Sequence, residues 1–252
     1  MSAALRVNSA IQLSVVVPVR NEAENILPLL AEIHAALEPH CEFEVIYVDD
    51  GSEDASLRVL REAQASYPRL RVLSHRLSCG QSAALASGVR AAHAAWIATL
   101  DGDGQNDPGD LPKLLAARDA PVRPQRLQLV CGYRRSRRDS FLKRLSSRVA
   151  NAVRSRLLGD ATPDTGCGLK LVARAAYLEL PFFDHMHRFL PALVQRGGGA
   201  TISVEVGHRP RTRGRSNYGL HDRLWVGIVD LLGVLWLRRR MRRAETSELT
   251  RP

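Results

Sequence analysis

Two carboxylates separated by a single residue mark the segment of the chain best suited to chemistry, Asp101-Gly102-Asp103-Gly104-Gln105. If this segment follows a strand, the two carboxylates point the same way and can share one site, to which Gln105 adds a neutral oxygen. Such oxygen ligands favour Mg²⁺ or Mn²⁺, and a bound ion would neutralise a diphosphate leaving group. The pattern is short and common, so the alternative is a solvated turn, in which Asp and Gly are frequent.

The elements that must position these carboxylates can be read from the apolar pattern. Three apolar runs do not alternate with polar residues, so each predicts a strand buried on both faces; they are Ser14 to Val19, Val45 to Val48 and Trp96 to Leu100. Segments with helical spacing follow or separate them, namely Ala23 to Leu37, Asp54 to Ala65 and Gln81 to Ala92. The order strand, helix, strand, helix, strand, helix, strand predicts an α/β fold with a doubly wound, mainly parallel sheet, which a strand at Leu127 to Cys131 would extend.

In an open parallel sheet, ligands bind beyond the carboxyl ends of the strands. The strand predicted at Val45 to Val48 ends in Asp49-Asp50-Gly51-Ser52 and the strand predicted at Trp96 to Leu100 ends in the Asp101 segment, so the two acidic groups should converge on one crevice. The first strand ends in Pro18-Val19-Arg20-Asn21-Glu22, a loop that could clasp a base and ribose. The sequence contains no G-x-x-x-x-G-K-[ST] motif, and no G-x-G-x-x-G follows the first strand. This disfavours P-loop NTPases and dinucleotide oxidoreductases.

The composition is that of a globular protein with a strongly basic surface. The 252 residues are 45% hydrophobic and carry a formal net charge of +10, and 33 of the 36 basic residues are Arg. Arg suits phosphate because its planar fork binds two oxygens at once, although a solvated basic surface is the plainer interpretation. A nucleic-acid-binding protein is the competing class, but aromatic residues are only 5% and do not interleave with the arginines.

The C-terminal part holds an apolar stretch next to a basic cluster. Leu224 to Leu237 is apolar except for Asp230 and runs into Arg238 to Arg243. About 20 residues are needed to span a bilayer, so this stretch is expected to lie in the membrane interface or to pack against the domain or a subunit. We therefore expect one domain at residues 11–219, an apolar helix with its basic cluster at 220–243 and a frayed tail at 244–252.

Cysteine and histidine spacing gives no further site. The four cysteines lie far apart without a C-x-x-C pair, which favours a reduced, cytosolic setting with Cys79 and Cys167 as small packing residues. The N-terminus lacks the apolar core of a signal peptide. His185 and His187 are expected on the surface or along an acceptor groove, on a helix that ends near Gln195.

Four motifs in order carry a family resemblance: Val16 to Glu22, Val48 to Ser52, Gly80 to Ala84 and Asp101 to Pro108. Together they resemble glycosyltransferase family 2 with the GT-A fold, most closely its polyprenol-phosphate branch. The resemblance implies an inverting transfer of a sugar from a nucleotide-diphosphate-sugar to a polyprenyl phosphate, with Mg²⁺ or Mn²⁺, at the inner face of the cell membrane. No nucleic-acid partner is expected, and the intact Asp101-Gly102-Asp103 motif and the arginines at 209–215 count against a non-catalytic sugar-nucleotide sensor with the same fold.

Carried over position by position, the resemblance assigns roles to individual residues. The metal and diphosphate group becomes Asp101, Asp103 and Gln105, and the nucleotide-binding residues become Pro18, Arg20, Glu22, Asp50, Gln81 and Asp101. The catalytic group becomes Arg134, Arg148 and Arg211, which meet the phosphates, and Asp164, which orients the acceptor. The sequence departs from the branch at Gly102, where Ala is usual, and at Asn217, where Lys is usual. The sugar, the nucleotide and the acceptor length stay open, as do a non-lipid acceptor, a homo-oligomer and a membrane-protein partner.

Overall fold

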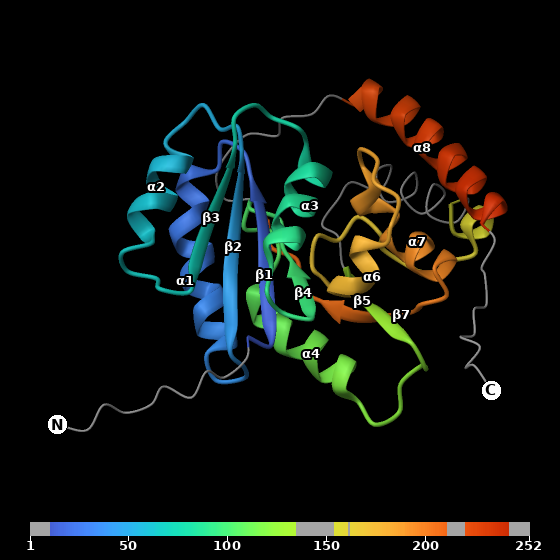
Figure 1. Ribbon diagram of the computed structural model, residues 1–252, viewed down its shortest axis with the longest axis horizontal. Coiled ribbons are helices and arrows are strands. Elements are labelled where there is room, and N and C mark those ends of the chain that lie inside the picture. Colours follow the sequence, from blue (N-terminus) through green and yellow to red (C-terminus); the bar gives the residue numbers. More distant parts are fainter. Residues whose placement is uncertain (1–10, 135–153, 161, 211–219, 242–252) are drawn as a thin grey trace, which may run out of the picture.

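The computed structural model describes residues 11–134, 154–160, 162–210 and 220–241. The first half of the chain alternates strands and helices as the apolar runs predict (Figure 1). Its elements are β1 (Leu13–Val19), α1 (Ala23–Leu37), β2 (Phe43–Asp50), α2 (Ser56–Ala63), β3 (Leu70–His75), α3 (Gln81–Ala91) and β4 (Trp96–Thr99).

The second half adds three strands to the same sheet and several helices around it. Its elements are η1 (Pro108–Asp110), α4 (Leu111–Asp119), β5 (Leu127–Arg134), β6 (Lys170–Ala173), α6 (Arg174–Leu178), η2 (Met186–Arg188), α7 (Leu190–Arg196), β7 (Ala200–Val206) and α8 (Leu220–Arg240). Residues 154–158 are also helical, and residues 135–153 lie outside the described residues.

The seven strands lie in the order β3-β2-β1-β4-β6-β5-β7. The pairs β1·β2, β1·β4, β2·β3 and β5·β7 are parallel, and β6 is antiparallel to both of its neighbours. The expected mainly parallel sheet is therefore confirmed. The chain leaves β1 toward β2 and β3 on one side and returns to β4 on the other, so the topological switch point lies between β1 and β4.

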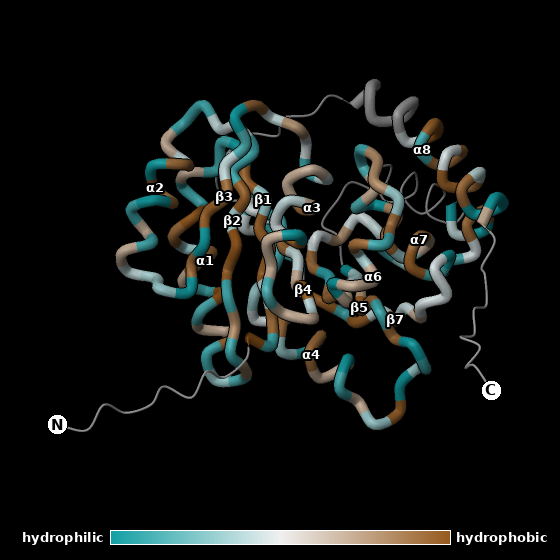
Figure 2. Tube along the Cα trace, in the orientation of Figure 1, coloured by the Kyte–Doolittle hydropathy of each residue, from teal (hydrophilic) through white to brown (hydrophobic). Residues whose placement is uncertain are grey.

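The central strands β1, β2 and β4 are buried on both faces, and alternate side chains supply two separate cores. In β1, Val15 and Val17 pack into a core covered by α1, α2 and α4, whereas Val16 packs into a second core covered by α3 and α7. Figure 2 shows hydrophobic residues running along the central strands. Since a parallel sheet must be covered on both faces, continuous apolar runs were the correct signal for these strands.

Helix α8 has two different sides. Val234 is buried against the second core, with Leu231, Leu235 and Leu237 packed partly beside it. On the other side four large apolar side chains are exposed: Ile228 at 41%, Val229 at 65%, Leu232 at 60% and Trp236 at 59%. None of the helices in the described residues is both long and apolar enough to cross a bilayer.

The acidic residue in the middle of α8 lies on its docked side. The Asp230 carboxylate lies 3.3 Å from His185 Nδ1, in the turn before η2. Burial raises the pKa of Asp230, and His185 and Arg188 act in the opposite direction. Arg196 in α7 also donates from Nε to the Leu237 carbonyl, 3.0 Å away. Polar contacts therefore fix the orientation of α8 on the domain.

Candidate active site

The acidic segments gather at the carboxyl ends of β1, β2 and β4, on both sides of the switch point. β1 pairs with β2 as far as Val19, but with β4 only as far as Val16. Beyond β4, the Asp101 turn fills the space beside the end of β1. Pro18 has no strand partner on that side, which explains how a residue without an N–H is accommodated inside a sheet.

Backbone hydrogen bonds hold the Asp101 turn in shape. The Asp101 N–H donates to Asn106 Oδ1 at 3.0 Å, and the Gln105 N–H donates to Asp103 Oδ1 at 3.1 Å. The Asp101 carboxylate accepts a bond from Gln81 Nε2, at the start of α3, at 2.8 Å. These contacts support the two carboxylates from both sides, and Asn106 is a supporting residue that the sequence motif did not reveal.

Two glycines allow the turn to pack closely. A Cβ at Gly102 would lie 2.5 Å from Val19 Cγ1 and 2.9 Å from the Pro18 carbonyl oxygen, so Ala does not fit at this position without movement of β1. A Cβ at Gly168, in the loop before β6, would lie 2.2 Å from Asp101 Oδ2. The backbone at Gly168 therefore lies directly against the Asp101 carboxylate.

The Asp101 carboxylate lies in a low-dielectric setting with another acid beside it. Burial raises the pKa of Asp101 and the charge of Asp103 raises it further, whereas Lys170, Gln81 and Arg134 partly offset this. Lys170 is buried in β6, and its ammonium donates to the Cys167 carbonyl. Neither spacing nor motif singles out this lysine in the sequence.

These residues fit a hard divalent cation. Asp101 and Asp103 supply carboxylate oxygens, Gln105 follows in the same turn, and the charge of Asp103 acts on the buried Asp101 carboxylate. An ion held here would offset the negative charge, and an all-oxygen ligand set suits Mg²⁺ or Mn²⁺.

The loops that follow β1 and β2 are fastened to one another. Asn21 adopts a left-handed conformation with φ of 55°. Its N–H donates to Ser52 Oγ at 3.0 Å, and its side-chain oxygen accepts from the Glu53 N–H at 2.8 Å. The Glu22 N–H donates to Ser56 Oγ at 2.9 Å, whereas Arg20 is exposed. The predicted nucleotide-binding loop is thus fixed by its backbone.

Asp50, at the end of β2, organises the loop that precedes α3. Its carboxylate accepts from the N–H groups of Cys79 and Gly80, from Ser78 Oγ and from the ring of His75, over distances of 2.7 to 2.9 Å. Burial acts to raise the pKa of Asp50, but these hydrogen bonds outweigh it and the pKa is lowered. Its predicted contact with a nucleotide base would therefore be made by a carboxylate that already has several partners.

Arg134 and Asp164 are brought together although they lie 30 positions apart in the chain. Nε of Arg134 donates to Asp164 Oδ2 at 2.7 Å, and Nη2 of Arg134 donates to Asp164 Oδ1 at 3.1 Å. The two side chains therefore form a bidentate ion pair. Only 12% and 9% of these side chains are exposed. The Arg134 charge also acts on Asp101, so this pair borders the Asp101 turn.

Two predicted arginines, Arg148 and Arg211, lie outside the described residues. The start of the segment that carries Arg211 is described. The Arg209 N–H donates to the Gln105 carbonyl at 3.0 Å, and its guanidinium lies 2.7 Å from Asp107 and 2.6 Å from Glu32. The chain therefore runs past the Asp101 turn immediately before it reaches residue 211.

The two histidines are not on the helix that ends near Gln195, and that expectation was wrong. His185 is a left-handed residue with φ of 61°, and His187 lies in η2, while α7 begins at Leu190. His187 is partly buried, and its Nδ1 lies 2.7 Å from Ser82 Oγ in α3. Burial, with Lys170 nearby, lowers the pKa of His187 to about 3. It is therefore a neutral packing contact between η2 and α3.

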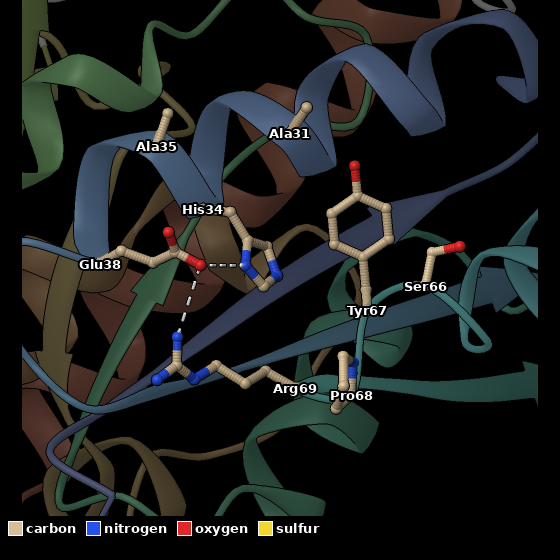
Figure 3. Close-up of a pocket in the computed structure, with 8 residues that line it drawn as sticks. All are labelled: Ala31, His34, Ala35, Glu38, Ser66, Tyr67, Pro68 and Arg69. Atoms are coloured by element: carbon tan, nitrogen blue, oxygen red, sulfur yellow. Dashed lines mark hydrogen bonds and ion pairs between the residues drawn. The ribbon is translucent and has the colours of Figure 1, made fainter.

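A wide hollow of about 600 Å³ lies elsewhere, between α1 and the turn before β3 (Figure 3). Its lining residues are Ala31, His34, Ala35, Glu38, Ser66, Tyr67, Pro68 and Arg69. They lie at the amino ends of the strands, and none of the predicted site residues lines the hollow. The candidate active site therefore lies at the opposite ends of the strands, where the carboxylates gather.

Comparison with known proteins agrees with this geometry. The family model described as "Glycosyl transferase family 2" matches residues 14–180. The dodecaprenyl-phosphate galacturonate synthase of Rhizobium johnstonii is 36% identical over 243 residues, covering 91% of this chain and 68% of that protein. The undecaprenyl-phosphate 4-deoxy-4-formamido-L-arabinose transferase of Edwardsiella ictaluri is 34% identical, covering 82% of this chain and 63% of that protein.

Solved structures share the fold at lower identity. A glucosyl-3-phosphoglycerate synthase from Mycobacterium tuberculosis, in complex with Mn²⁺, uridine diphosphate and glucosyl-3-phosphoglycerate, matches with a TM-score of 0.66 and 20% identity, over 93% of this chain and 82% of that one. The mannosyl-3-phosphoglycerate synthase from Rubrobacter xylanophilus matches with a TM-score of 0.67 and 19% identity, over 95% and 79%. The family match over residues 14–180 agrees with the acidic turn at the switch point. The chain therefore belongs to glycosyl transferase family 2.

Proposed function

We propose that this protein transfers a sugar from a nucleotide-diphosphate-sugar to a polyprenyl phosphate, with inversion at the anomeric carbon. The observation that carries the donor half of this proposal is the Asp101 turn at the switch point, with Asp103 beside Asp101 and Gln81 and Arg134 acting on the same carboxylate. The acceptor half rests on the two relatives, a dodecaprenyl-phosphate galacturonate synthase and an undecaprenyl-phosphate 4-deoxy-4-formamido-L-arabinose transferase.

The donor is proposed to lie across the carboxyl ends of β1, β2 and β4. Asp101, Asp103 and Gln105 would hold Mg²⁺ or Mn²⁺, which when bound supplies positive charge to the leaving diphosphate. Pro18, Arg20, Glu22, Asp50 and Gln81 form the proposed nucleotide side. Since their loops are already fastened by backbone hydrogen bonds, little ordering is needed on binding.

The acceptor is proposed to approach from the side of β5 and β6. A phosphate monoester has a second pKa of about 6, so its oxygen is anionic at neutral pH and needs no strong base. Asp164 is held by Arg134, which suits a group that orients the acceptor rather than one that removes a proton. Arg134, Arg148 and Arg211 are the proposed groups that hold the two anionic substrates close together.

We further propose that residues 11–219 form the catalytic domain and that residues 220–243 attach it to the inner face of the cell membrane, from the cytoplasmic side. The exposed apolar row on α8 ends at Trp236 and is followed by exposed Arg239 and Arg240. An apolar face and a basic cluster together give the two signals that reversible attachment needs.

Flotation with liposomes tests the attachment. The intact chain should float with vesicles that contain anionic lipid and should be released by high salt, whereas Leu232→Glu with Trp236→Glu should lower the bound fraction at least about tenfold, because charges on this face oppose insertion. Arg58→Glu, on an exposed part of α2, is the matched control for added negative charge. Equal flotation of the double variant would place the membrane contact elsewhere.

The activity itself is tested by a substrate screen. Purified protein is incubated with Mg²⁺ or Mn²⁺, a panel of labelled nucleotide-sugars and undecaprenyl phosphate, and label is scored in the organic phase. A parallel reaction replaces the lipid with 3-phosphoglycerate. We expect metal-dependent label in the lipid from at least one donor. Transfer only to the soluble acceptor would contradict the lipid assignment.

A further inference from the structure

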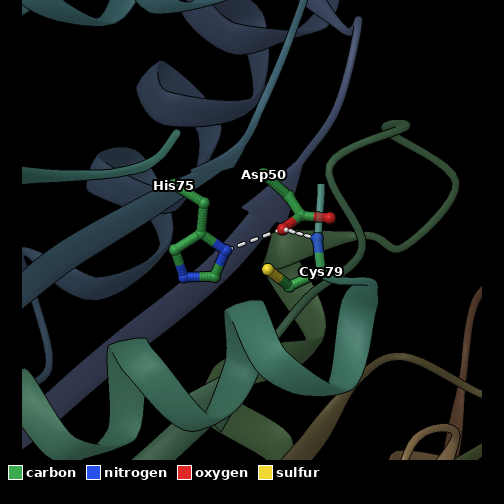
Figure 4. A group of neighbouring side chains, drawn as sticks. All are labelled: Asp50, His75 and Cys79. Carbon is green, nitrogen blue, oxygen red and sulfur yellow. Dashed lines mark hydrogen bonds and ion pairs between the residues drawn. The ribbon is translucent and has the colours of Figure 1, made fainter. Parts of the chain in front are cut away.

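A thiol and an imidazole meet a carboxylate beside the proposed nucleotide site. Asp50 ends β2, His75 ends β3 and Cys79 lies in the loop before α3, and the ligand atoms of the three lie within 4.8 Å of one another. Figure 4 shows the imidazole and the thiol converging on the Asp50 carboxylate. Within the described part of the chain, this is the one group of three or more His, Cys, Asp or Glu side chains that could hold an ion.

The surroundings hold these groups in place. Asp50 and His75 are direct neighbours across the β2·β3 pair, and His75 Nδ1 lies 2.7 Å from Asp50 Oδ1. The other ring nitrogen, Nε2, lies 2.9 Å from Ser87 Oγ in α3. Gly51, with φ of 67°, lets the loop approach, because a Cβ there would lie 2.7 Å from the Ser78 nitrogen. The ring therefore has the outer partner that metal-binding histidines usually have.

We propose that Asp50, His75 and Cys79 form a site for a thiophilic divalent cation such as Zn²⁺. Thiolate and imidazole ligands select Zn²⁺, whereas the oxygen ligands of the Asp101 turn select Mg²⁺ or Mn²⁺. Zn–N and Zn–S bonds are about 2.1 and 2.3 Å long, so the thiol must adjust its position to reach the ion. Cys79 is exposed, so it has room for this movement.

Binding of the ion fixes the tautomer of His75 and removes the thiol proton of Cys79. The ring binds the ion through Nδ1 and carries its proton on Nε2, which donates a hydrogen bond to Ser87 Oγ. The Cys79 thiol loses its proton to solvent and binds as thiolate. Asp50 Oδ1 exchanges its bond from the ring for the ion and keeps the bond from the Cys79 N–H. Water completes the fourth position, and one proton is released for each ion bound.

Occupation of this site should hinder the nucleotide. The Asp50 carboxylate is the proposed contact to the base. It also accepts a hydrogen bond from the Gly80 N–H, and the next residue, Gln81, contacts Asp101. An ion bound to Asp50 therefore competes with the donor. This consequence rests on the proposed function, whereas binding of the ion does not.

Direct binding is the first test. The full chain is titrated with Zn²⁺ in excess Mg²⁺, which fills oxygen-only sites, by calorimetry in buffers of different ionisation enthalpy, and with Co²⁺ by absorption. We expect one ion and one released proton for each chain, and a thiolate-to-cobalt charge-transfer band. Cys79→Ser should weaken Zn²⁺ binding at least about 50-fold and remove the band, and Cys41→Ser, at a partly buried cysteine elsewhere, should change neither. Equal binding by Cys79→Ser, or binding without the band, would overturn the site.

Kinetics are the second test. In the transferase reaction, Zn²⁺ should raise the apparent KM for the donor without lowering kcat, a chelator selective for Zn²⁺ over Mg²⁺ should reverse this, and Cys79→Ser should be resistant. Zn²⁺ bound with no change in KM would overturn the competition. If the chain lacks transferase activity, the proposed function fails, and the binding test still decides the metal site.

Discussion

The part of the sheet formed by β1 to β4 and the part formed by β5 to β7 hold their functional groups in different ways. In the first part, backbone N–H groups and adjoining loops hold the carboxylates, as Cys79 and Gly80 hold Asp50. In the second part, buried ion pairs do so, as Arg134 holds Asp164. Loss of a carboxylate held by N–H groups leaves neutral donors without an acceptor, whereas loss of one member of a buried ion pair leaves an uncompensated charge.

The largest expected effect is at the place where the two parts touch. Gly168→Ala would put a methyl group 2.2 Å from the present position of Asp101 Oδ2, so the carboxylate must move. A displacement of about 1 Å in such a site costs on the order of 100-fold in rate. We expect kcat/KM to fall by at least that factor while the far-UV spectrum is unchanged. Gly233→Ala, where the added Cβ would meet nothing within 4 Å, is the control.

The next largest effect is the loss of stability when the buried ion pair of the second part is broken. Removing one member of a buried pair costs about 3 to 5 kcal/mol, whereas exposed pairs contribute less than about 1 kcal/mol. Asp164→Ala should therefore lower the free energy of unfolding by about 3 kcal/mol in urea titrations. Glu62→Ala, which breaks the exposed pair with Arg58, should cost less than about 0.5 kcal/mol. Similar losses of unfolding free energy in Asp164→Ala and Glu62→Ala would contradict the claim that the Arg134–Asp164 pair acts as a buried pair.

The smallest effect concerns the η2 contact with α3. The pKa of His187 is lowered to about 3 in the folded chain, against about 6.5 when unfolded. Below pH 6.5 the unfolded chain takes up a proton that the folded chain does not, so this group lowers stability as the pH falls toward 3.

His187→Gln should therefore flatten the fall in unfolding free energy between pH 6 and pH 4, by up to about 1.4 kcal/mol per pH unit. The exposed His40→Gln is the matched control. An unchanged slope in His187→Gln would show that the ring is protonated in the folded state.

The same contrast explains which features the sequence could predict. Continuous apolar runs identified β1, β2 and β4, because strands buried on both faces need them, and the acidic motifs follow those strands directly. The sequence also indicated an α/β fold of mainly parallel strands. Those predictions rest on residues that are adjacent in the chain, so a local pattern was enough.

Other features depend on residues far apart and had no local signal. Lys170 lies near the Asp101 turn only because β6 runs antiparallel beside β4, and no local sequence pattern predicts that strand pairing. The contact of Gly168 with Asp101 has the same origin. Helix α8 is apolar around most of its circumference, so its sequence could not show which side docks through Val234 and which exposes Leu232.

The central claim is that the turn after β4 holds the cation that binds the donor diphosphate, and calorimetry tests it most directly. Nucleoside diphosphates are titrated into the protein and into Asp103→Ala, with Mn²⁺ and with chelator. We predict that at least one nucleotide binds the unaltered protein in Mn²⁺ and at least about 100-fold more weakly in chelator, and that Asp103→Ala, with an unchanged unfolding midpoint, binds weakly in both. Equally tight binding in chelator, or by Asp103→Ala in Mn²⁺, would contradict the claim.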